Sequence, residues 1–193
     1  MLKDIFVSTV RVKLLKILLP QSDSEFHVRA LVRSVGTEIN AVRRELTRLQ
    51  KIGLLKRRPS GNKVYYKVNT HSVYYPELLS LVSKEMGLGK AIIENAKALG
   101  DIKFAVLSKA YSRGRQSSML DIDLLIIGDV NLTVLEKIIK DEESKTGREV
   151  HYTVLSEEEF LYRKRKNDNF ITSVLAQSRT MLLGDEEAFC KLS

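Results

Sequence analysis

The chain has 193 residues, which is enough for one large domain or two small ones. Apolar residues make up 44% of it and charged residues 29%, which excludes wholesale disorder, and no apolar run approaches the ~20 residues that cross a bilayer. The net charge of +8 is confined to the first third: residues 1–68 hold 15 Lys and Arg against 5 Asp and Glu, whereas residues 69–193 hold 17 against 19. This concentration of charge indicates a polyanionic partner for the N-terminal part, with nucleic acid the first one to consider.

The first third of the chain predicts three helices followed by a β-hairpin. Apolar residues recur at helical spacing, and Pro20, Gly36 and Gly53 mark where the helices end. Thr37 is the predicted N-cap of the third helix, because its hydroxyl can accept a hydrogen bond from a backbone N–H that has no partner within the helix. The predicted elements are helices over 7–18, 28–35 and 38–52 and strands over 54–59 and 63–68, with a turn at 60–62 between the strands.

The helix over 38–52 has an apolar face for the core and a polar, basic face for solvent. Arginine on such a face can pair with guanine in the major groove and asparagine with adenine, while the basic hairpin after the helix suits phosphates. The alternative is a solvated basic face over an ordinary helical core. The candidate DNA-binding residues are Thr37, Asn40, Arg43, Arg44, Thr47, Arg48, Lys51, Arg57, Arg58, Asn62 and Lys63.

The stretch HVRALVRSVGTEINAVRRELTRLQKIGLLKRRPSGNKVYYKVN resembles the winged helix-turn-helix regulators of the ArsR and MarR type. The resemblance covers residues 1 to about 70 and implies a domain that binds double-stranded DNA and regulates transcription. We also expect a homodimer, in which a two-fold axis would place two recognition helices on half-sites about 34 Å apart. A protein-interaction module on the same fold is the alternative.

Residues 71–100 are predicted to form a helical connector, after which strands alternate with helices. One helix is expected from Tyr75, and Gly87-Leu88-Gly89 separates it from a second helix that ends near Gly100. The aliphatic run over 122–127 is typical of a strand that is covered on both faces. The other expected elements are strands over 102–107, 150–155 and 181–183 and helices over 132–146, from Ser156 onward and over 170–177.

Asp121 and Asp123 flank Ile122 at the start of that buried strand, so the alternation of side chains directs both carboxylates to one side. Two carboxylates so placed can share a divalent cation, and Mg²⁺ prefers such oxygen ligands. A pair of surface acids at a strand edge is the structural alternative. No Cys/His metal cage is expected, because the chain has one cysteine and three histidines.

The stretch KAYSRGRQSSMLDIDLLIIGD resembles the minimal nucleotidyltransferases of the polymerase-beta superfamily. Their motif runs Gly-Ser, then x-Ala-Arg-Gly, a short turn and Asp-x-Asp. Over about residues 101–155, the resemblance implies that Asp121 and Asp123 are the metal-binding and catalytic carboxylates. It implies a nucleotide-binding set of Lys109, Ser112, Arg113 and Gly114.

Two departures from that motif predict a domain that has lost catalysis. Lys109-Ala110 stands where the family has Gly-Ser, which adds a Cβ where the backbone approaches phosphate and removes a hydroxyl. The third carboxylate of the family falls at or near His151, with Glu149 the nearest acid. Mg²⁺ is therefore a cofactor only if this domain retains its metal site.

Together these patterns predict a two-domain α/β protein. A winged helix-turn-helix domain (α+β) is expected at 1–70, a connector at 71–100, and a nucleotidyltransferase-like α/β domain with a small mixed sheet at 101–193. The favoured function is a DNA-binding transcriptional regulator with an inactive second domain. The alternatives are a Mg-dependent nucleotidyltransferase acting on a nucleic-acid or protein acceptor, and an antitoxin-like partner protein.

The expected partners are double-stranded DNA, a second copy of the chain, and a nucleotide or a partner protein, but no membrane. The N-terminus does not resemble a signal peptide, and Cys190, as the single cysteine, can form no internal disulfide. We therefore expect a reducing, cytoplasmic location.

Overall fold

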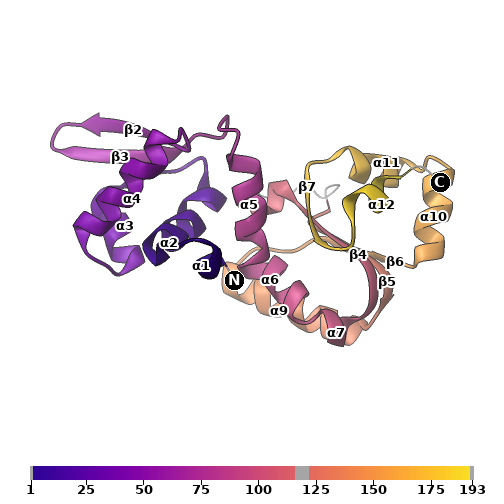
Figure 1. Ribbon diagram of the computed structural model, residues 1–193. Coiled ribbons are helices and arrows are strands. Elements are labelled where there is room, and N and C mark those ends of the chain that lie inside the picture. The colour runs from indigo at the N-terminus through magenta and orange to yellow at the C-terminus, as the bar shows by residue number, and fades with distance from the viewer. Residues whose placement is uncertain (1, 116–121, 192–193) are drawn as a thin grey trace. The chain divides into compact units, whose positions relative to one another are not determined.

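The computed structural model describes residues 2–115 and 122–191, and the chain forms two compact units, Met1–Glu85 and Met86–Ser193. We call these the first and the second unit (Figure 1). Within the described ranges, no helix has both the length and the apolar character needed to cross a membrane.

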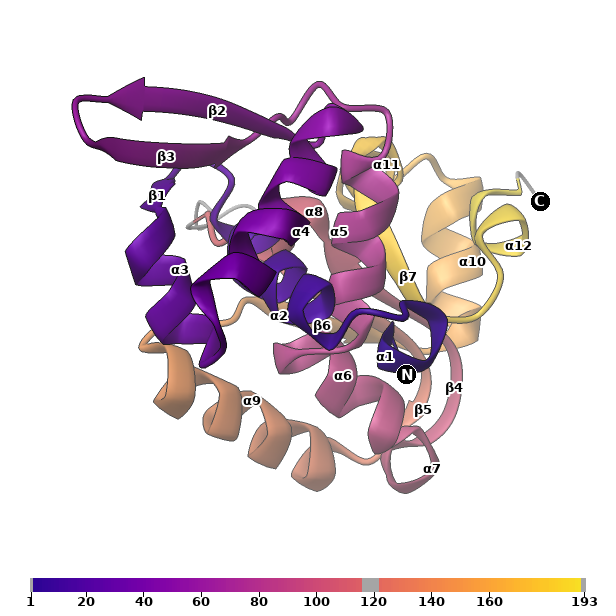
Figure 2. The same ribbon diagram turned by 60° about the vertical axis from the view of Figure 1, so that its left-hand side comes forward.

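The first unit consists of helices followed by an antiparallel hairpin and one further helix (Figure 2). The helix over 28–35 has the predicted bounds, and Gly36 ends it with a φ of 67°, a left-handed conformation that glycine adopts without strain. The elements are α1 (Leu2–Ile5), α2 (Thr9–Leu18), the short 3-10 helix η1 (Leu19–Gln21), β1 (Glu25–His27), α3 (Val28–Val35), α4 (Ile39–Lys51), β2 (Leu55–Ser60), β3 (Lys63–Val68) and α5 (Tyr75–Lys84).

The core of the first unit lies among α2, α3 and α4. Leu14, Leu31 and Leu46, one from each helix, are completely buried, and the apolar stripe predicted on α4 is confirmed. Thr37 was wrongly predicted as the N-cap of this helix. Glu38 holds that position, and its side chain makes no capping hydrogen bond.

The hairpin of the first unit belongs to a three-stranded antiparallel sheet with the order β1-β3-β2. The predicted strands correspond to β2 and β3, with Gly61 at a φ of 57° in the turn. The third strand, β1, was missed because its three residues are too few to show an alternating pattern. It pairs Phe26 with Tyr66 and so joins the segment before α3 to the hairpin.

The second unit is built on a four-stranded mixed sheet with the order β6-β5-β4-β7. Strand β5 is antiparallel to β4 and parallel to β6, and β7 is antiparallel to β4. The elements are α6 (Gly87–Glu94), α7 (Ala96–Leu99), β4 (Gly100–Ser108), α8 (Lys109–Ser112), β5 (Leu124–Val130), α9 (Leu132–Thr146), β6 (Tyr152–Leu155), α10 (Glu157–Arg165), α11 (Asn169–Ala176), β7 (Arg179–Leu183) and α12 (Glu186–Cys190).

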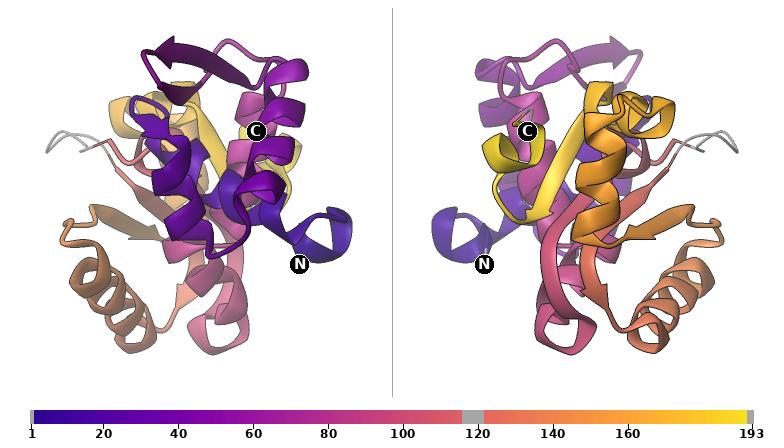
Figure 3. Two further views of the ribbon diagram at one scale, coloured as in Figure 1. Left: turned by 90° about the vertical axis from the view of Figure 1, so that its left-hand side faces the viewer. Right: turned by 90° about the vertical axis from the view of Figure 1, so that its right-hand side faces the viewer.

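Helices cover both faces of this sheet, so alternate residues of each central strand enter different cores. On β4, Ala105 and Leu107 pack with residues of α6 and α9. Phe104 and Val106 pack on the other face with residues of α10, α11 and α12. Figure 3 shows α9 and α10 on opposite sides of the sheet. The small mixed sheet is as predicted, and so is the unbroken burial of residues 124–127 in β5.

Several boundaries differ from the predicted ones. The strand predicted over 122–127 begins at Leu124, so Asp123 lies in the loop that leads into β5. Of the segment 71–100, α5 belongs to the first unit, whereas α6 and α7 belong to the second. The short helices α8 and α12 were missed, because four or five residues do not reveal a helical period.

Candidate functional site

Asp123 lies immediately before β5 and is held in place by His151, which lies immediately before the parallel strand β6. The backbone N–H of Asp123 donates to the carbonyl of His151 at 2.8 Å. In return, Oδ2 of Asp123 accepts a hydrogen bond from the backbone N–H of His151 at 3.1 Å. The Asp123 residue is only 2% exposed, so the sheet fixes a buried carboxylate at this end of β5.

The side chain of His151 lies beside the same carboxylate. Its Nδ1 atom is 3.8 Å from Oδ2 of Asp123, and the side chain is 33% exposed. By the resemblance to the nucleotidyltransferases, the family's third carboxylate falls at or near His151. In the structure, the imidazole of His151 lies next to Asp123 in place of a carboxylate. Glu149 is exposed, and Asp121 lies outside the described residues.

The segment predicted to bind nucleotide forms the short helix α8 and the turn after it. Oγ of Ser108 accepts from the N–H of Tyr111, and the hydroxyl of Ser112 donates to the Ser108 carbonyl, both at 3.1 Å. Ser112 is therefore buried and engaged in the helix itself. Lys109 is half-buried, and the exposed Gly114 has a φ of 68°. Arg113, the fourth predicted residue, is the C-cap of α8.

A polar contact behind α8 was not predicted and orients that helix. The hydroxyl of Tyr111 donates to Oε1 of Glu142 in α9 at 3.2 Å, and both residues are buried. The guanidinium of Arg148 lies 4.6 Å from the centre of the Tyr111 ring. Burial of the phenol, followed by the charge and hydrogen bond of Glu142, raises the pKa of Tyr111 far above its usual value.

The described residues of the second unit do not complete a magnesium site. Across residues 2–115 and 122–191, no three His, Cys, Asp or Glu side chains gather closely enough to hold a metal ion. Beside Asp123 stands an imidazole nitrogen, whereas Mg²⁺ prefers oxygen ligands. A small cavity of about 10 Å³ adjoins Asp123, with Ser108 and Arg179 also in its lining.

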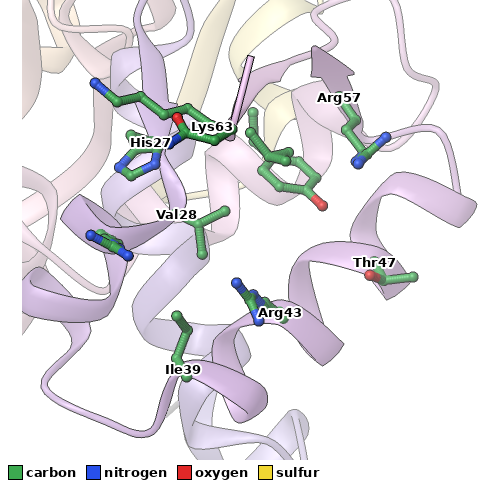
Figure 4. A pocket seen from close by; sticks show the side chains of 11 residues that line it. His27, Val28, Ile39, Arg43, Thr47, Arg57 and Lys63 are labelled. Carbon is green, nitrogen blue, oxygen red and sulfur yellow. The ribbon is translucent and has the colours of Figure 1, made fainter. Parts of the chain in front are cut away.

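The first unit contains a much larger cavity, of about 470 Å³, between α3, α4 and the hairpin (Figure 4). Arg43 and Thr47, one helical turn apart on α4, line one side of it, and Arg57 of β2 lines another. The full lining is His27, Val28, Arg29, Ile39, Arg43, Thr47, Arg57, Asn62, Lys63, Val64 and Tyr66. We call this space the basic cavity.

The basic cavity brings together five of the predicted DNA-binding residues, namely Arg43, Thr47, Arg57, Asn62 and Lys63. It adds His27 and Arg29, which the sequence analysis did not include because they precede the predicted recognition helix. Asn40, Arg44 and Lys51 are exposed on α4 but do not line the cavity, and neither does the half-buried Thr37.

Two predicted arginines are instead neutralised by carboxylates. Nη1 of Arg48 lies 2.8 Å from Oε1 of Glu45. Arg48 lines a second, largely apolar cavity of about 460 Å³. The Nε–H and Nη2–H groups of Arg58 donate three hydrogen bonds to the carboxylate of Glu25, and this contact lowers the pKa of Glu25. Neither Arg48 nor Arg58 lines the basic cavity.

Two comparisons relate this chain to nucleotidyltransferases. Residues 91–173 match the family described as "Nucleotidyltransferase domain". A protein of Methanocaldococcus jannaschii named "Putative protein adenylyltransferase MJ0604" is 35% identical over 97 residues, which is 48% of this chain and 95% of that protein. The range 91–173 that matches the family lies within the second unit and contains the segment from β4 to β6.

Proposed function

The chain belongs to the nucleotidyltransferase family, and from this premise we propose that its second unit transfers a nucleotidyl group from a nucleoside triphosphate to an acceptor hydroxyl. In this reaction the acceptor oxygen bonds to the α-phosphorus, the bond from that phosphorus to the leaving pyrophosphate breaks, and the hydroxyl proton passes to solvent. The observation that carries the proposal is the buried Asp123 carboxylate, fixed by the backbone of His151.

Two further observations support a choice of donor and acceptor. The name of the Methanocaldococcus jannaschii relative favours ATP as the donor and a protein hydroxyl as the acceptor. The basic first unit supports a nucleic-acid hydroxyl as the second acceptor to test. In place of the Gly-Ser pair, Lys109 supplies a positive charge that attracts phosphate, although with a geometry different from that of a glycine turn.

The test is transfer of label by the full chain. ATP labelled at the α-phosphate is incubated in Mg²⁺ buffer with the chain alone, with a model protein, and with short RNA and DNA strands. We expect label to enter one acceptor from the α-position but not from the γ-position. Asp123→Asn should lower this transfer roughly a hundredfold, because an amide cannot take up the hydroxyl proton on its way to solvent as a carboxylate can.

Asp129→Asn is the matched control, because Asp129 is an exposed acid at the opposite end of β5. It should transfer label as the unaltered chain does. Equal transfer by the Asp123→Asn and Asp129→Asn proteins, or no transfer to any of these acceptors, would contradict the proposal.

A second function is proposed for the first unit: a winged helix that binds duplex DNA and thereby regulates transcription. The favouring observation is a set of cations without carboxylate partners. Among the described residues, Arg29, Arg43, Arg57 and Lys63 make no ion pair, yet all four line one cavity next to α4. Phosphate contacts made by such residues predict affinity for duplexes that falls steeply as salt rises.

Duplex binding is tested by fluorescence anisotropy with labelled DNA fragments between low and physiological salt. A linear fall of log affinity with log salt supports the proposal, and a signal that stays flat at low salt rules it out. We also propose that the chain acts as a homodimer, with two copies of α4 on half-sites about 34 Å apart. Sedimentation of the DNA complex should then show two chains on each duplex.

A further inference from the structure

The basic cavity has a floor as well as a charged rim. Val28, which is 7% exposed, Val64 and Tyr66 contribute apolar surface beneath the cationic groups. Thr47 and Asn62 add a hydroxyl and an amide that can donate and accept hydrogen bonds. Its volume of about 470 Å³ falls within the range of small-molecule sites, and its lining combines four apolar or aromatic residues with seven polar or cationic ones.

The charge of the rim is uncompensated. Across the described parts of the chain, none of the lining residues is an acid, and none of the four Lys and Arg residues is held by a carboxylate elsewhere. Arg48 and Arg58 differ in this respect, because Glu45 and Glu25 neutralise them outside the cavity.

The start of α3 adds backbone donors to this rim. His27 is the N-cap of this eight-residue helix and makes no side-chain capping hydrogen bond. Both His27 and Val28, the first residue of α3, line the cavity. The first N–H groups of a helix have no intrahelical acceptor, and they favour an anion.

We propose that the basic cavity binds the phosphate groups of a free nucleoside triphosphate, at a site separate from Asp123. The guanidinium groups of Arg43 and Arg57 hold the phosphates, and the apolar floor with Thr47 and Asn62 accommodates the nucleoside. The same phosphate chemistry is present in a polynucleotide backbone, but a backbone phosphate alone would leave the apolar floor unused. Because bound nucleotide neutralises Arg43, it would also weaken duplex binding by the first unit.

The test is equilibrium dialysis of ATP against the full chain at physiological salt. EDTA is present so that no divalent ion bridges nucleotide to Asp123. We expect saturable binding of one ATP, with AMP bound much more weakly. Arg43→Ala and Arg57→Ala should each lower the affinity roughly tenfold or more, because each removes charge-assisted hydrogen bonds to phosphate.

Arg44→Ala is the matched control: it removes the same charge from the next position of α4, outside the cavity. It should change ATP affinity less than twofold, and thermal unfolding should show that all three variants fold. Equal losses from Arg43→Ala and Arg44→Ala would mean diffuse attraction and would overturn the proposal. So would the absence of saturable ATP binding.

Two further arms identify the source of the phosphate and separate this site from the transferase site. In the first, duplex is added to the chain and its variants; if only duplex binds and its binding depends on Arg43, the ligand is the backbone and the proposal is wrong. In the second, Asp123→Asn should leave ATP binding in EDTA unchanged. Loss of ATP binding in that variant alone would assign the nucleotide to the second unit. Failure of label transfer with ATP binding intact would refute the transferase proposal only.

Discussion

Nη1 of Arg48 lies 2.8 Å from Oε1 of Glu45, three residues earlier on α4. The other carboxylate oxygen, Oε2, lies 2.8 Å from Nε of Arg11 in α2. The Glu45 residue is only 2% exposed, so a buried acid sits between two arginines on the helix that carries most of the candidate DNA-binding residues. The arginines of α4 are therefore not equivalent, although they look alike in the sequence.

This difference predicts unequal effects on duplex affinity. Arg43→Ala should lower the affinity roughly tenfold and reduce the slope of log affinity against log salt by about 0.9, because one phosphate contact is lost. Arg48→Ala should lower the affinity less than about threefold, because Glu45 already neutralises much of its charge. Anisotropy titrations at several salt concentrations measure both. Equal slopes for the two variants would contradict the assignment of Arg43 to the binding surface.

The buried position of Glu45 predicts how its contribution to stability depends on pH. Burial alone raises the pKa of Glu45, but the hydrogen bond and charge of Arg11, together with the charge of Arg48, bring it below the usual range. A carboxyl with a lowered folded-state pKa stabilises the protein above its unfolded pKa of about 4.3, and this contribution is lost as the pH falls through the folded value.

Glu45→Gln should therefore lower the free energy of unfolding by about 1–3 kcal/mol at pH 7. The difference from the unaltered chain should shrink on acidification below about pH 4.3. Urea unfolding between pH 7 and pH 3 measures it. Glu38→Gln, at the exposed N-cap of the same helix, where the side chain makes no capping hydrogen bond, is the control and should stay close to the unaltered chain. A difference independent of pH would show that the charge of Glu45 is not what stabilises the fold.

The stability that Tyr111 contributes is expected to fall at alkaline pH, whereas that of Glu45 is expected to fall at acidic pH. The raised pKa of Tyr111 keeps the folded phenol protonated when an unfolded tyrosine, with a pKa of about 10, begins to ionise. The stability that Tyr111 contributes is therefore complete below about pH 10 and declines as the pH rises above it. Tyr111→Phe should cost about 1–3 kcal/mol at pH 8, because the buried Glu142 loses its hydrogen-bond donor. That cost should decrease between pH 9.5 and 11, and urea unfolding of both proteins would show whether it does.

A side chain at Gly128 in β5 is expected to destabilise the sheet of the second unit, because the backbone of the neighbouring strand lies close to it. The φ of Gly128 is 142°, and a Cβ there would collide with the backbone carbonyl oxygen of Asp101 in the paired strand. Gly128→Ala should lower the free energy of unfolding by about 3 kcal/mol. Gly147, which ends α9 with a φ of 66°, has open space around such a Cβ. Gly147→Ala should therefore cost only about 1 kcal/mol. Similar costs in thermal unfolding would argue against the collision.

The sequence predicted the fold best where a pattern was long and regular. The bounds of α3 and α9 were predicted to the residue, because apolar spacing was clear and glycine ended each helix. The mixed sheet of the second unit was expected from the resemblance to the minimal nucleotidyltransferases. Strand β1 and the helices α8 and α12 were missed because three to five residues are too few to show a strand or helical period.

For the candidate sites, the sequence by itself determined which chemical groups are present. It identified the basic character of residues 1–68, the acids before β5, and the replacement of Gly-Ser by Lys109-Ala110. Only the tertiary structure decided how those groups combine: that His151 fixes Asp123, that Glu45 neutralises Arg48, and that Arg43 and Arg57 meet across one cavity. The physical reason is that helical and strand periodicity assigns a side chain to a face, whereas pairing and burial depend on which segments, distant in sequence, pack against that face.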